Sequence, residues 1–215
     1  ETGLAPLPVC EAPDGVEALA QMTAALTGDG DAPQDLQVYV LDHEMINAFA
    51  LPGGFVVLFR GLLEEAETPD EVAAVLAHEI GHVVSRDPTR HALRSAGSIG
   101  VLGLLFGDFA GGAAVLFLTE RLISAQYSQQ AETDADAFGY ERLEAAGVSP
   151  AAMGDMFDRL RDEADDGESR LLSHFLSHPS LSDRIEAARA AADPAQVYDA
   201  ILTDAEWANL QTICD

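Results

Sequence analysis

The first third of the chain carries apolar residues at helical spacing and then in short, nearly continuous runs. Residues 16–26 have the helical spacing and are predicted to form an amphipathic helix, which the glycines and proline of 28–33 end. Three short apolar runs follow, at 36–41, 45–51 and 55–59. Runs of this length bounded by turn residues, such as the Pro-Gly-Gly at 52–54, are typical of strands. The pattern predicts one helix followed by a small antiparallel sheet.

The remaining two thirds of the chain are predicted to be mostly helical. Thr68-Pro69-Asp70-Glu71 is a helix start, with Thr68 as N-cap, Pro69 in the first turn and Glu71 closing a capping box. This helix should continue to about residue 84 and end before Pro88. Further helices are predicted at 119–146, 150–163, 169–176 and 180–192. A helix, a small sheet and then many helices together indicate an α+β fold.

Residues 95–118 form the most apolar stretch of the chain. A membrane-spanning helix needs about 20 continuous apolar residues. Asp108 interrupts the stretch next to several glycines, and each half is too short to cross a bilayer. The pattern therefore favours a buried helix pair over a span, while a hairpin that touches a membrane stays an alternative.

Length and charge narrow the function classes. The 215 residues suit one domain, and 48% are hydrophobic, as in ordinary globular proteins. The chain has 37 acidic and 11 basic residues, all of the latter arginine, for a net charge of −26. Such a charge repels phosphate backbones, so we expect no nucleic-acid partner, and it disfavours a basic patch that binds anionic lipid.

The two ends of the chain carry the only cysteines, Cys10 and Cys214. They are either two separate thiols or a disulfide that joins the ends, which would require an oxidising compartment. The first residues, Glu1-Thr2-Gly3, lack an initiator Met. We therefore expect a processed end, with an upstream targeting or membrane-anchoring segment removed.

The strongest chemical signal is the sequence His78-Glu79-Ile80-Gly81-His82. On a helix, positions i and i+4 share a face, so both imidazoles can bind one ion, and zinc suits such a site. Glu79 can reach a water on the metal and accept its proton. Gly81 costs about 1 kcal/mol relative to Ala within a helix, which indicates close approach by another group.

A catalytic zinc usually has a third protein ligand. Glu132 and Asp136 lie one turn apart on a predicted helix, so one could bind the metal while the other holds an imidazole. Taken alone, in so acidic a chain, such a pair is more often a solvated helix face. Two further regions carry little signal: His91, after Pro88, is predicted to lie in a loop, and 193–215 has no motif.

Four segments, taken in order, resemble the M48 family of zinc metallopeptidases. They are residues 47–54 (NAFALPGG), 78–82 (HEIGH), 127–136, and 177–185 with its Ser-His-Pro and Arg-Ile. The resemblance implies a mostly helical, gluzincin-like zincin domain at 16–192, between an irregular segment at 1–15 and an extension at 193–215. It also implies one zinc per chain, with Glu132 as third ligand and Asp136 supporting a ligand histidine.

The same resemblance assigns further residues around the zinc. Residues 47–50 (Asn47, Ala48, Phe49 and Ala50) would line the substrate cleft. His178 would lie near the metal, where it either stabilises the oxyanion or acts as a silencing fourth ligand. Arg184 would support the same part of the site, near the metal. Gln129 departs from the pattern, because the family usually has arginine there.

These residues lead to a functional hypothesis. We expect a zinc endopeptidase that cuts extended or misfolded protein segments, with Glu79 as general base. A chaperone-like or latent protein, silenced by His178 until a partner opens the site, is the alternative. We expect protein or peptide substrates and an exported bacterial protein, periplasmic or associated with a membrane through 95–118 or an upstream anchor. The oligomeric state stays open.

Overall fold

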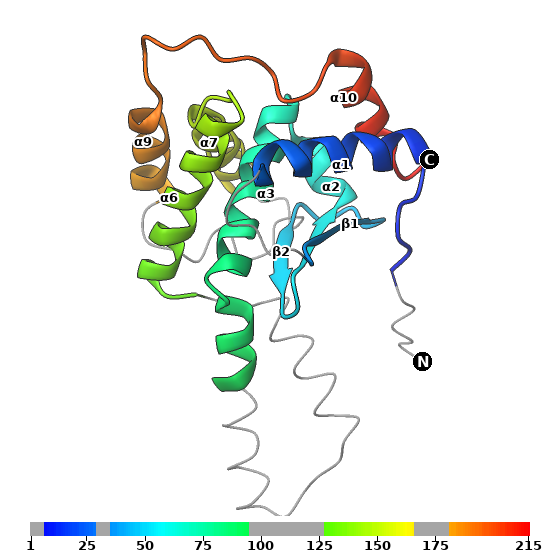
Figure 1. The fold of residues 1–215 in the computed structure, drawn as a ribbon, viewed down its shortest axis with the longest axis horizontal. Coiled ribbons are helices and arrows are strands. Elements are labelled where there is room, and N and C mark those ends of the chain that lie inside the picture. Colours follow the sequence, from blue (N-terminus) through cyan, green and yellow to red (C-terminus); the bar gives the residue numbers. More distant parts are fainter. Residues whose placement is uncertain (1–6, 29–34, 95–126, 166–180) are drawn as a thin grey trace, which may run out of the picture.

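The computed structural model describes residues 7–28, 35–94, 127–165 and 181–215. The expectations for 95–118, for the helix at 169–176 and for His178 lie outside these ranges. Within them, most of the chain is helical and one small sheet is present, so the predicted α+β class is confirmed (Figure 1).

The sheet has three strands in the order β1-β3-β2. Strand β2 (Ala48–Leu51) pairs antiparallel with β3 (Phe55–Phe59), across a turn in which Gly53 and Gly54 have φ of +97° and +89°. Strand β1 (Gln37–Leu41), however, pairs parallel with β3.

The expectation of a wholly antiparallel sheet was therefore wrong, and the link between β1 and β2 explains why. Residues 42–47 do not form a tight hairpin. They cross the end of β3, where the Gly61 N–H donates to the His43 carbonyl and the Phe59 N–H to that of Asn47. This crossing places β1 and β2 on opposite sides of β3, so the sheet is mixed.

Helix α3 (Pro69–Val84) is the centre of the molecule, buried along almost its whole length. Thr68 caps it as predicted, because its side chain accepts from the Glu71 N–H. The capping box, however, does not close on Thr68. The Glu71 carboxylate instead accepts from the Glu67 N–H and from the Arg159 guanidinium.

Helices α6 and α7 pack on one side of α3, and α9 packs on α7 and α6 (Figure 1). Their bounds are Gln129–Ala145, Ala151–Asp165 and Leu181–Ala191. Residues 119–126 of the helix predicted at 119–146 lie outside the described ranges; α6 itself begins at Gln129, because Ser128 is its N-cap and accepts from the Ala131 N–H. Residues 87–94 are also helical, so His91 lies on a helical turn and the loop prediction was wrong.

Glycines let α3 and α6 approach each other closely. A Cβ added at Gly81 would lie 3.1 Å from the Ala135 Cα, and one added at Gly139 would lie 3.5 Å from the His78 backbone nitrogen. The close approach predicted at Gly81 is therefore made by the backbone of α6. It brings the acidic residues of α6 to the histidines of α3.

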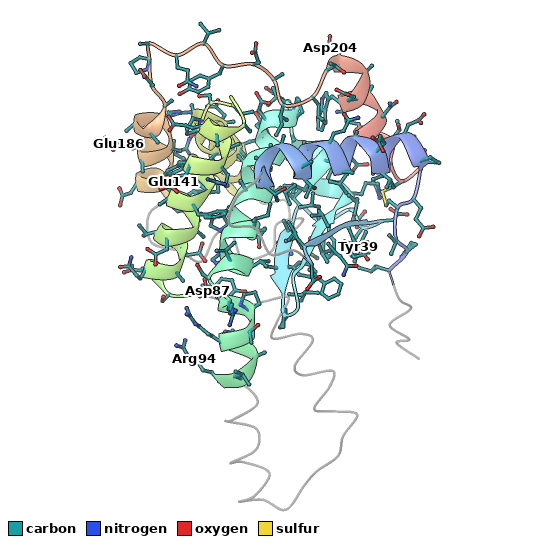
Figure 2. All side chains as sticks on the ribbon, in the orientation of Figure 1. Tyr39, Asp87, Arg94, Glu141, Glu186 and Asp204 are labelled. Atoms are coloured by element: carbon teal, nitrogen blue, oxygen red, sulfur yellow. A yellow bond between two sulfur atoms is a disulfide. The ribbon has the colours of Figure 1, made fainter. Side chains whose placement is uncertain are left out.

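The two ends of the chain meet on the other side of α3. Helix α1 (Pro13–Thr27) lies against α10 (Asp204–Gln211), and α2 (Arg60–Glu65) connects the sheet to α3 (Figure 1). The 193–215 region thus contains a helix, which Thr203 and Glu206 begin with a capping box. Cys10 and Cys214 form a disulfide with Cα atoms 4.4 Å apart (Figure 2).

Across the described ranges, we find no helix with the length and apolar character needed to span a membrane.

Candidate metal centre

Two buried histidines on α3 form the base of the site. His78 and His82 are 2% and 0% exposed, and one helical turn separates them. Their Nε2 atoms lie 3.1 Å apart. Both imidazoles therefore present the same nitrogen to one point, as their i, i+4 spacing predicts.

Glu132 reaches this point from α6. Its Oε2 lies 3.4 Å from the Nε2 of His78, and its Oε1 lies 3.5 Å from the Nε2 of His82. One ligand atom from each of the three residues lies within 4.8 Å of the others. Two imidazoles and a carboxylate form a donor set that suits a catalytic zinc, so these residues fit the ion that the sequence implies.

Asp136, one turn further along α6, holds His78 from behind. Its Oδ1 lies 2.8 Å from the Nδ1 of His78, so this nitrogen donates to the carboxylate and Nε2 points toward Glu132. Arg184 of α9 donates to Asp136 through Nε and Nη2, each at 2.7 Å. Asp136 and Arg184 are 5% and 9% exposed, so this chain of contacts is shielded from water.

The electrostatics of the three groups are strongly coupled. Burial lowers the pKa of His78, but hydrogen bonds to Asp136 and Glu132 outweigh it and raise the pKa to about 10. Burial raises the pKa of Glu132, but the two histidines outweigh it and hold the pKa far below its usual range. Without a metal, the centre therefore retains a proton at neutral pH between its imidazoles and its carboxylates.

Glu79 lies on the same helix and is completely buried. Burial first, and then the negative charges of Glu79 and Asp87, raise the pKa of Tyr127. The charge of Glu79 also acts on His82. The carboxylate thus belongs to the same electrostatic environment as the ligand pair.

His82 also contacts two side chains that no motif in the sequence marked as functional. The Oδ2 of Asp87 lies 3.1 Å from the Nδ1 of His82, and the Tyr127 ring packs on the imidazole with centroids 4.3 Å apart. In the sequence, Tyr127 is only the first residue of the segment 127–136 that resembles the family. The available signal for Asp87 was its place five residues after His82 and directly before Pro88.

The proposed cleft residues, 47–50, are found on and just before β2. This strand is at one edge of the described sheet, and it contacts α3. Phe49 packs on Val57 and Phe59, with its ring 5.5 Å from that of Phe59, on the face of the sheet opposite to the one on which Ala48 and Ala50 join the main core. Asn47 is fully buried, and within the described residues its amide atoms have no hydrogen-bond partner. His178 lies outside the described residues.

Comparison with known proteins identifies the family. Residues 16–192 match the model of peptidase family M48. The chain is 32% identical to the metalloprotease LoiP of Escherichia coli K12, over 73% of this chain and 62% of LoiP. It is 33% identical to the β-barrel assembly-enhancing protease of the same organism, over 72% of this chain and 34% of that protein.

A eukaryotic protein is also similar to this chain. The mitochondrial metalloendopeptidase OMA1 of Schizosaccharomyces pombe is 31% identical, over 80% of this chain and 51% of OMA1. The chain thus spans less than two thirds of the length of each of these relatives. Since the family model covers most of the chain, and the buried donor set fits the zinc that M48 metallopeptidases use, the chain belongs to peptidase family M48.

Proposed function

We propose that this chain is a zinc-dependent endopeptidase that cuts extended segments of other proteins. The observation that carries the proposal is the convergence of His78, His82 and Glu132 on one buried point, with Glu79 on the same helix. A solvated acidic face would leave Glu132 exposed, whereas it is 4% exposed and directed at two imidazoles.

The chemistry follows from the roles that these positions allow. A zinc ion held by His78, His82 and Glu132 would polarise the scissile carbonyl and lower the pKa of a bound water. Glu79 would accept the proton of the attacking water and donate it to the leaving amine. Asp136 would keep the His78 imidazole oriented, and Arg184 would act through Asp136 rather than on the substrate.

An extended substrate would pair with the edge of β2. An edge strand offers unpaired backbone groups to a second extended chain, and such pairing places few demands on side chains. The burial of the Phe49 side chain against Val57 and Phe59 supports this, because Asn47–Ala50 would then bind through the backbone. Recognition of this kind suits unfolded or misfolded clients of varied sequence.

The disulfide supports an exported location. Disulfides persist in oxidising compartments such as the bacterial periplasm, and Cys10–Cys214 is formed in this structure. One relative is named for enhancing β-barrel assembly. We place this chain in the quality control of exported proteins, in the periplasm or at a membrane surface.

Replacement of the general base tests the proposal. Glu79→Gln should keep its zinc and its fold, and lose casein hydrolysis by about 10²–10⁴-fold, the usual effect of removing a general base. Glu141→Gln, an exposed change of the same kind on α6, should retain full activity. Near-normal hydrolysis by zinc-loaded Glu79→Gln would refute the role.

The same digest addresses the alternative of a chaperone-like or latent protein. If neither wild type nor Glu79→Gln cuts, while both delay client aggregation, the binding role replaces the enzymatic one. His178→Ala then separates the proposed roles of His178. Higher activity than wild type would indicate a silencing fourth ligand, whereas a loss of kcat with zinc retained would indicate an oxyanion donor.

A further inference from the structure

Asp87 makes a contact with the second histidine of the site that the proposed mechanism does not use. Its Oδ2 lies 3.1 Å from the Nδ1 of His82. His82 is fully buried and Asp87 is 8% exposed, so water competes little for this hydrogen bond. On a neutral imidazole, a proton on Nδ1 that donates to Asp87 leaves Nε2 as the acceptor. That nitrogen is the one that lies 3.1 Å from the Nε2 of His78.

The two histidines are thus held in the same way from different parts of the chain. Asp136 reaches His78 from α6 and is itself held by Arg184. Asp87 reaches His82 from the chain just after the end of α3, five residues after His82 itself. Arg90 lies nearby, with its Nη1 3.5 Å from the Oδ1 of Asp87. Each imidazole therefore has its own aspartate, although Arg184 is buried against Asp136 whereas Arg90 is mostly exposed.

The end of α3 makes the contact with Asp87 possible. On a continuous α-helix, a residue five positions after His82 would be rotated by about 140° and would face elsewhere. Helix α3 instead ends at Val84, and Arg86 takes the left-handed conformation with φ of +57°. Among the described residues other than glycine, only Arg86 has a positive φ.

The reversal at Arg86 returns the chain toward the site. The Arg86 N–H donates to the Val83 carbonyl, and a new helical segment starts at Asp87 (Figure 2). Residues with a Cβ disfavour the left-handed region, and such conformations gather where a functional geometry demands them. The backbone at Arg86 therefore points to a purpose for the position of Asp87.

We propose that Asp87 is a positioning residue that fixes the tautomer and orientation of His82 for zinc. This inference rests on the proposed function, because it assumes that His82 is a ligand. Carboxylates that hold ligand histidines raise the basicity of the imidazole, and their loss typically weakens metal binding about 10–100-fold. Asp87 and Asp136 act on different imidazoles, so each contributes separately.

The test measures zinc affinity and metal-free stability on the full chain. Asp87→Ala should raise the zinc dissociation constant, determined by competition with a chromophoric chelator, by about 10–100-fold. Asp87→Asn retains an acceptor for Nδ1–H, so its loss should be smaller. Asp134→Ala is the matched control. Asp134 and Asp87 line one surface pocket, but Asp134 is exposed and pairs with Gln130. Its zinc affinity should equal that of wild type.

A second readout separates positioning from a purely structural role. If Asp87 only begins the helical segment 87–94, its loss lowers the Tm of the metal-free and zinc-bound proteins equally and leaves zinc affinity unchanged. That result would overturn the inference while the metal site stands. Failure of the wild type to bind zinc would instead overturn the proposed function. In long-range ¹H–¹⁵N spectra of the metal-free proteins, the population of Nδ1-protonated His82 should fall in Asp87→Ala and stay as in wild type in Asp134→Ala.

Discussion

At the scale of single residues, His78 must lose the proton on its Nε2 before that nitrogen can bind a metal. Its pKa is about 10 in the metal-free site, because Asp136 and Glu132 stabilise the imidazolium against burial. A zinc ion replaces that proton with a larger positive charge. The same carboxylates that retain the proton therefore make the site selective for a cation.

Zinc binding should accordingly release protons near pH 7.5, and apparent zinc affinity should rise with pH up to about 10. Titration calorimetry in two buffers of different ionisation enthalpy measures the number of protons released. Asp136→Asn, which removes one of the groups that raise the pKa of His78, should release fewer. Equal apparent enthalpies in the two buffers for the wild type would contradict the prediction.

The stability of the metal-free protein should have the opposite dependence on pH. A histidine whose folded pKa lies above its unfolded value of 6.5 stabilises the fold fully below 6.5, and this contribution disappears as pH rises through about 10. The stabilisation by His78 is therefore lost between these two values. Zinc affinity increases over the same range.

At the scale of elements, the packing of α3 on α6 sets the distance between the histidines and Glu132. Ala135, which faces Gly81, is placed between Glu132 and Asp136 on α6. A larger side chain at Gly81 would push α6 away at the point where it carries both acids. Helix packing and metal affinity are therefore coupled at this glycine.

Gly81→Val should destabilise the fold by about 1–3 kcal/mol, as overpacking typically does, and should also weaken zinc binding. Gly15→Val is the control, since a Cβ at Gly15 of α1 meets Asn209 of α10 and Ile213 just after it, within 2.8 Å. It should lose stability while its zinc affinity stays unchanged. Urea denaturation and chelator competition provide the two measurements. Unaltered zinc affinity in a destabilised Gly81→Val would separate packing from metal binding.

The sequence predicted elements well where local signals were strong. Thr68 and Pro69 marked the start of α3, and the spacing of His78 and His82 placed both imidazoles together. The parallel pairing of β1 with β3 was missed because it depends on where residues 42–47 cross, which tertiary contacts decide.

The role of Asp87 was missed for a related reason. The left-handed turn before it is made by an arginine, and a glycine at Arg86 would have signalled the reversal. The contact of Glu71 with Arg159 was likewise out of reach, since the two residues are 88 positions apart in sequence. The HEIGH motif and the resemblance to M48 predicted the candidate metal site, whereas contacts between distant segments required the structure.

At the scale of the whole molecule, one covalent bond joins the two ends of the chain. Cys10 and Cys214 are 204 residues apart in sequence, and Cys10 is 6% exposed. The bond joins the segment before α1 to the segment after α10, on the side of α3 away from α6 (Figure 1). It constrains the unfolded chain far from the metal centre.

Loss of this bond should lower stability without affecting the centre. The Cys10→Ser/Cys214→Ser variant should lose about 2–5 kcal/mol of unfolding free energy, as removal of native disulfides typically does. Denaturation curves of wild type with reductant should approach those of the variant, whereas reductant should not change the variant. Two titratable thiols in the native, non-reduced protein would contradict the bond itself.

The same bond changes what a cut in the backbone can do. Between Cys10 and Cys214 the chain is a closed ring, so a single cleavage opens the ring and releases no fragment. A protease is exposed to its own peptide-cleaving activity. A molecule nicked once in a surface loop should run as one species on a non-reducing gel, and divide into two only after reduction. A single self-cleavage within the ring would therefore leave both pieces tethered to each other.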